Sequence, residues 1–103
     1  LPERGMWMFD TRQFEKINPQ YFNIIMLSEH DVTVQSRNTG HYWYLHNTDY
    51  PAEGNCVIFH KHKVSHPYHL HGKAGTLLQA VRSIKEHDKW QLENKYKRKT
   101  LEK

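Results

Sequence analysis

The sequence predicts an α+β fold: a small two-layer sandwich in which a four-stranded antiparallel meander is covered on one face by two helices. Two observations predict it. Apolar and polar residues alternate strictly over 32–36, which is typical of a strand, and the 37–40 turn with its glycine then leads into another alternating segment. Near the C-terminus the apolar residues follow helical spacing instead, at Leu77, Ala80, Val81 and Ile84.

The first element is predicted to be a short helix. Asp10 has the character of an N-cap, and Gln13 stands three residues later, as in a capping box. Phe14 and Ile17 share one face of this helix, and Pro19 ends it within about two turns. Residues 21–28 are apolar on both faces, so a central strand covered on both sides is predicted there.

Two further strands are predicted at 41–46 and 56–63. The first directs Trp43 into the core, and Trp90 is assigned to the core as well because of its size. Alternation leaves the opposite sheet face to Thr33, Gln35, Tyr42, Tyr44, Lys61 and Lys63. Residues 64–75 are expected to form a histidine-rich loop.

A long helix is predicted to start after Thr76, with Gln79 in the third helical position, and to continue to about Asn94. The domain organisation is therefore one α+β domain over 1–94, followed by a basic, frayed tail over 95–103. This length suits a single core.

Composition excludes several classes of protein. No apolar run is long enough for a membrane-spanning helix, and no membrane association is expected. The first ten residues do not resemble a secretion signal. The single Cys56 excludes an internal disulfide, and its place at the start of a strand favours burial over reactivity. A cytoplasmic protein is therefore expected.

The charge distribution indicates a polyanionic partner. The formal net charge is +4, and residues 54–85 contain five basic residues and no acidic one. A one-sided positive field attracts nucleic acid. The alternative is an ordinary solvated surface, since a modest net charge is weak evidence by itself.

The leading functional hypothesis is a small nucleic-acid-binding protein, with duplex DNA favoured over RNA. Arg37 would enter a groove from the hairpin tip, and Tyr42 and Tyr44 would offer stacking rings. The expected nucleic-acid contacts are Arg37, Asn38, Tyr42, Tyr44, Lys61, Lys63, Lys73 and Arg82. A homodimer would suit duplex half-sites. A protein-interaction or inhibitor module with an acidic protein partner is a further alternative.

Histidines supply an enzymatic alternative. His60, His62, His69 and His71 all fall within twelve residues and, with Arg37, carry the groups needed for metal-independent RNA cleavage. The same four histidines are also candidate metal ligands. However, the zinc-binding Cys and His spacings are missing, and residues 54–85 contain no acid, so no cofactor is expected.

Two segments carry a resemblance to known proteins. The stretch from Ser36 to Trp43, together with His60–His62 and Tyr68–Gly72, resembles small, mostly uncharacterised phage and conjugative-element proteins of Gram-positive bacteria. The resemblance covers about a fifth of the chain and assigns no functional residue. It implies a role in DNA handling, such as that of an accessory factor of a mobile element.

Overall fold

The computed structural model describes the backbone of residues 9–48 and 56–101, and side chains within these ranges as far as Lys95. Five antiparallel strands form one sheet in sequence order: β1 (Phe22–Leu27), β2 (Asp31–Ser36), β3 (Tyr42–Asn47), β4 (Cys56–Lys61) and β5 (His69–Ala74). The α+β meander is confirmed, but it has one strand more than predicted. His69–Ala74 was expected to be loop, because its sequence has no apolar alternation; pairing with β4 makes it an edge strand.

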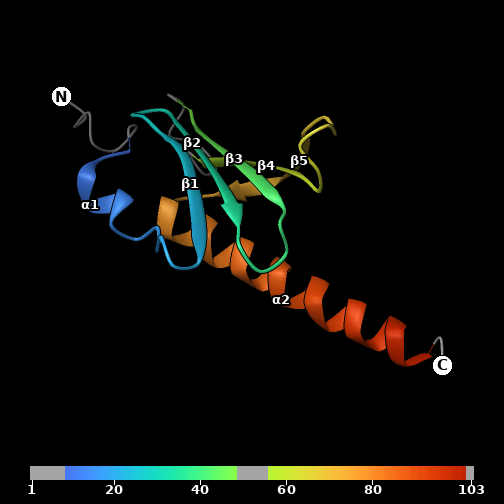
Figure 1. Ribbon diagram of the computed structural model, residues 1–103. Coiled ribbons are helices and arrows are strands. Elements are labelled where there is room, and N and C mark those ends of the chain that lie inside the picture. Colours follow the sequence, from blue (N-terminus) through green and yellow to red (C-terminus); the bar gives the residue numbers. More distant parts are fainter. Residues whose placement is uncertain (1–8, 49–55, 102–103) are drawn as a thin grey trace.

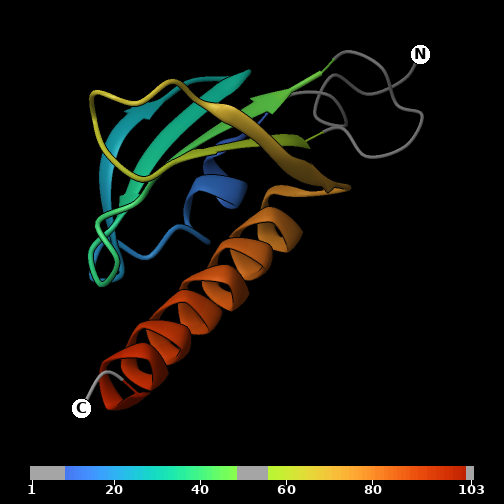
Figure 2. The same ribbon diagram turned by 90° about the vertical axis from the view of Figure 1, so that its right-hand side faces the viewer.

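Both helices lie on one side of the curved sheet (Figures 1 and 2). The short helix α1 (Thr11–Phe14) has the predicted capping box between Asp10 and Gln13. The long helix α2 (Leu77–Leu101) begins as predicted, because the Gln79 amide donates a hydrogen bond of 3.1 Å to the Thr76 hydroxyl.

Helix α2 is longer than predicted. It continues past Asn94 to Leu101, so the backbone of most of the expected tail is helical. Its C-terminal half projects beyond the sheet (Figure 1), and the molecule is therefore elongated, with a longest dimension of 61 Å. No helix in the described ranges combines the length and the apolar character that a membrane crossing requires.

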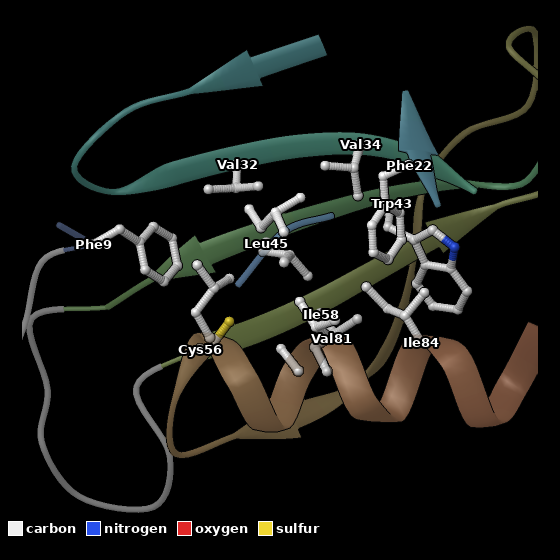
Figure 3. Close-up of a cluster of buried hydrophobic side chains, with 13 residues drawn as sticks. Phe9, Phe22, Val32, Val34, Trp43, Leu45, Cys56, Ile58, Val81 and Ile84 are labelled. Carbon is white, nitrogen blue, oxygen red and sulfur yellow. The ribbon is translucent and has the colours of Figure 1, made fainter. Parts of the chain in front are cut away.

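The core fills the space between the sheet and α2. Figure 3 shows Val32, Val34, Trp43, Leu45 and Ile58 pointing from the strands toward Val81 and Ile84 of the helix. The predicted burial of Cys56 is confirmed, and burial raises the pKa of its thiol to about 12. This cysteine is therefore a structural residue.

Two predictions about burial were wrong. Strand β1 is an edge strand, not a central one, and Ile25, Met26 and Leu27 are exposed. Within residues 9–48 and 56–101 no second layer covers its apolar run, and the pairing register shifts between Ile24 and Met26. Trp90 is 56% exposed, because it belongs to the part of α2 that continues past the sheet.

Candidate nucleic-acid interface and histidine cluster

The sheet face opposite the helices, called the outer face below, carries the half-buried side chains of the central strands. The burial pattern alternates through β2, β3 and β4, so that every second residue points away from the core. Cross-strand partners share a face, and Val57 is paired with Lys73 and Phe59 with Leu70. The outer face therefore includes Thr33, Gln35, Tyr42, Tyr44, Val57, Phe59, Lys61, Leu70 and Lys73.

Aromatic rings and a lysine are in contact on the outer face. The Tyr44 ring is stacked on Phe59 with centroids 5.6 Å apart, and Tyr68 lies 6.0 Å from Tyr44. The Lys61 ammonium lies 4.4 Å from the Tyr68 ring centroid and 5.5 Å from that of Tyr42. Four aromatic side chains and one cation thus form a continuous surface, called the aromatic platform below: Tyr42, Tyr44, Phe59, Tyr68 and Lys61. It resembles the stacking platforms of proteins that bind single-stranded nucleic acids.

One acidic group borders this surface. The Tyr44 hydroxyl donates a hydrogen bond to the Asp31 carboxylate, and the Nδ1 of His46 lies 2.9 Å from the same oxygen. These contacts lower the pKa of Asp31, the Tyr44 hydrogen bond being the larger cause. The contacts hold the Tyr44 ring in place beside Asp31.

A second group of side chains lies on the inner face of the sheet, around Trp43. The imidazole rings of this histidine cluster come from the residue before β3, from β4 and the residue after it, from β5 and from α2: His41, His60, His62, His69, His71 and His87. The four histidines predicted from sequence are thus brought together. Sequence reasoning missed His41 and His87 as members of a site.

The signals for these two residues were present in the patterns. Because His41 alternates with Trp43, it points to the same face as the core residues of β3. His87 follows Ile84 by three residues and so continues the apolar stripe of α2. Only the packing of α2 against β3 and β4, however, places these two rings together.

Short contacts connect the cluster. The Nδ1 of His41 lies 3.0 Å from the Nε2 of His60, and the Nδ1 of His60 lies 3.3 Å from the Nε2 of His69. His41, His60 and His87 each present one ring nitrogen to a common point, and these three nitrogens lie within 4.8 Å of one another. The Nε2 of His87 is buried and has no hydrogen-bond partner among the described residues.

Burial disfavours the charged form of several of these rings. Burial, together with the neighbouring imidazoles of His87 and His41, lowers the pKa of His60 to about 3. Burial also lowers the pKa of His41, His71 and His87, although Asp88 raises those of His41 and His87 in part. A general acid works best with a pKa near the operating pH, so the position of His60 gives little support to the ribonuclease hypothesis.

The remaining predicted contacts are dispersed. The Nε of Arg37 donates a hydrogen bond of 3.0 Å to the Pro19 carbonyl, and the Asn38 amide donates one of 3.3 Å to the Tyr21 hydroxyl, so the turn after β2 is tied to the chain before β1. Lys63 is exposed beyond the end of β4, and Arg82 is exposed on α2, in the other layer.

A cavity of about 530 Å³ lies between the β2–β3 turn and the projecting part of α2. Asn38 and His41 line one wall, and Trp90 and Lys95 line the other.

Phe59, Tyr68 and Trp90 were not among the predicted contacts. Phe59 alternates with Lys61 in β4, which is the signal that places it on the outer face.

No family model matches this sequence, and no match was found among curated proteins or among solved structures.

Proposed function

We propose that this protein binds single-stranded nucleic acid on the outer face of its sheet. The observation that carries the proposal is a group of aromatic contacts on a face that neither helix covers. Tyr44 contacts Phe59 and Tyr68 there, and the Lys61 ammonium lies over the rings of Tyr68 and Tyr42. Aromatic rings on an open sheet can stack with unpaired bases, whose faces a duplex keeps inaccessible.

Charge supports the same assignment. Lys61 and Lys73 accompany the rings on neighbouring strands β4 and β5, where they can contact the phosphates of a strand that crosses the sheet. The protein as a whole has a formal net charge of +4, which favours association with a polyanion. Duplex DNA contacted by Arg37, the expectation from sequence, becomes the competing hypothesis, because Arg37 lies in the turn after β2 and not among the aromatic rings of the outer face.

The test is fluorescence anisotropy with labelled single-stranded DNA, RNA and duplex DNA of matched length at several salt concentrations. We expect the single strands to bind more tightly than the duplex. Phe59→Leu and Tyr42→Leu should each weaken binding by about 5- to 150-fold, since stacking of one base contributes about 1–3 kcal/mol. Trp90→Leu is the matched control, because it removes an exposed aromatic ring from α2 instead of the sheet.

Charge and stacking contributions can be separated in the same assay. In a plot of the logarithm of the binding constant against the logarithm of the salt concentration, Lys61→Gln should make the slope shallower by about 0.7. This is the change expected when one phosphate contact to a single strand is lost. Phe59→Leu should leave that slope unchanged.

Three results would contradict the proposal. Duplex binding that is lost in Arg37→Gln and retained in Phe59→Leu would establish the hairpin as the contact. RNA that is cleaved during the assay would favour the histidine-dependent ribonuclease. If no nucleic acid binds even at low salt, the remaining hypothesis is a protein-interaction module with an acidic protein partner.

A further inference from the structure

We propose that His41, His60 and His87 form a binding site for Zn²⁺ or a similar late divalent transition-metal ion. The three residues come from the approach to β3, from β4 and from the middle of α2, so a bound ion would join the sheet to the helix. Imidazole nitrogen is a preferred ligand of Zn²⁺, Cu²⁺ and Ni²⁺, whereas Mg²⁺ and Ca²⁺ require oxygen ligands.

The geometry comes close to that of a metal centre. In a tetrahedral zinc site with bonds of about 2.0–2.1 Å, the ligand nitrogens are about 3.4 Å apart. The His41 and His60 nitrogens are already 3.0 Å apart, and the whole set lies within 4.8 Å. Closing the set therefore requires a movement of at most about 1.4 Å by the most distant ring, which a rotation of one side chain supplies.

The unpartnered nitrogen of His87 points to the same conclusion. A buried polar atom normally has a hydrogen-bond partner, and leaving it without one costs about 1–3 kcal/mol. The Nε2 of His87 has none among the described residues, although the rings of His41, His60 and His71 lie beside that of His87. A metal ion coordinated by this nitrogen would remove that cost.

The surroundings of the three rings also suit a cation. If the Nε2 of His60 binds the ion, its Nδ1 proton is free to be donated to the Nε2 of His69, 3.3 Å away. A hydrogen bond from the second ring nitrogen is the usual way in which proteins orient a histidine ligand. The buried carboxylate of Asp88, next to His87 in sequence, supplies a negative charge.

Asp88 is not itself assigned as a ligand. Its two oxygens accept hydrogen bonds from Tyr21 and Thr39. The fourth coordination position falls to a water molecule or to His62, whose exposed ring is stacked on His41 with centroids 4.2 Å apart. The site is thus distinct from the outer-face aromatic platform, and it does not depend on the proposed nucleic-acid function.

The site can be tested with the metal alone, in the absence of nucleic acid. The protein is treated with a chelator, and Zn²⁺ binding is measured by competition with a chromophoric chelator. Co²⁺ serves as a spectroscopic probe, because tetrahedral Co²⁺ absorbs strongly in the visible range. We expect one ion per chain, visible absorption with Co²⁺, and a higher Tm when Zn²⁺ is present.

Four variants distinguish the ligands from their neighbours. His87→Ala should weaken Zn²⁺ binding by more than about 100-fold, and His69→Ala, which removes only the orienting partner, by about 10- to 100-fold. His66→Ala is the matched control, since His66 is exposed in the turn between β4 and β5 and should not change the affinity. His62→Ala shows whether the fourth ligand is this histidine or water.

The proposal is overturned if the wild-type protein binds no Zn²⁺ at a ratio of one ion per chain, or if His87→Ala binds it as tightly as the wild type. It is also overturned if His66→Ala loses as much affinity as His87→Ala, because adventitious surface histidines would then hold the ion. Circular dichroism shows whether each variant is folded after the chelator has removed its metal. If His87→Ala is unfolded, His87→Gln and His41→Asn provide the same comparison.

Discussion

The hydroxyl of Tyr21 donates a hydrogen bond of 2.7 Å to the Oδ2 of Asp88, a residue 67 positions further along the chain. Asp88 is fully buried, and its Oδ1 accepts a second hydrogen bond, of 3.0 Å, from the Thr39 hydroxyl. One carboxylate therefore connects the residue before β1 and the β2–β3 turn to the middle of α2. The same contact fixes the rotation of the helix, and with it the direction in which His87 points.

We expect Tyr21→Phe to destabilise the protein by roughly 2 kcal/mol. The variant keeps the ring packing and removes one donor from a buried carboxylate, and hydrogen bonds to charged groups contribute about 1.5–3 kcal/mol. Urea unfolding followed by circular dichroism measures the loss. Tyr42→Phe, a hydroxyl deletion on the outer face, is the control, and an equal loss in both variants would contradict the role assigned to Asp88.

The hydrogen bond between Tyr21 and Asp88 also predicts that the stability of the protein depends on pH in the alkaline range. Burial and then the hydrogen bond to Asp88 raise the pKa of Tyr21 to about 12, from an ordinary value of 10.0. Because the folded state retains this proton more strongly than the unfolded state, the contribution of Tyr21 to stability is complete below pH 10 and is lost as the pH rises toward 12.

The stability difference between the wild type and Tyr21→Phe should therefore shrink between these two pH values. Denaturant unfolding of both proteins across this range measures it. A difference that stays constant, or grows with pH, would show that the Tyr21 pKa is not raised in the folded state.

The tryptophans of the core and of the helix should respond differently to the same substitution. The Trp43 indole is fully buried and donates a hydrogen bond of 3.1 Å to the Ser36 hydroxyl, so Trp43→Phe is expected to cost about 2 kcal/mol. Trp90→Phe should change the stability by less than about 0.5 kcal/mol, because Trp90 is mostly exposed. Thermal and urea unfolding provide the comparison, and a larger loss in Trp90→Phe would contradict the placement of α2.

The edge strand β1 predicts self-association. Ile25, Met26 and Leu27 are exposed beside backbone groups that β2 does not pair, and such edges bind further strands. We expect the molar mass measured by multi-angle light scattering to increase with concentration for the wild type. For Ile25→Lys it should stay at the value of a monomer. Val64→Lys, the same kind of change in the exposed β4–β5 turn, should behave like the wild type. Identical behaviour of all three proteins would exclude β1 as the contact.

Local sequence patterns predicted most of the elements correctly. The capping residues Asp10 and Thr76 mark true helix starts, and strict alternation in β2 and β3 assigned Trp43 to the core and Tyr44 to the outer face. These predictions succeed because capping hydrogen bonds and the two-residue period of a strand depend on neighbours in sequence.

Predictions that depended on distant neighbours succeeded less well. The apolar run of β1 predicts burial on both faces, yet its place at the edge leaves Ile25 exposed. Likewise, Trp90 has the size of a core residue, but the sheet is too short to cover that part of the helix. The fifth strand was missed because its pairing with β4, and not its own composition, makes it a strand.

The sequence by itself determined the α+β class, the helix starts, the faces of the central strands and the burial of Cys56, since each follows from local spacing and capping. Only the tertiary structure decided that His41 and His87 lie beside His60, and that Phe59 and Tyr68 join Tyr42 and Tyr44 on one surface. The physical reason is the same in both cases. Which side chains meet depends on strand register and on the rotation of α2 set by buried contacts such as that between Tyr21 and Asp88, and these link residues that are far apart in the chain.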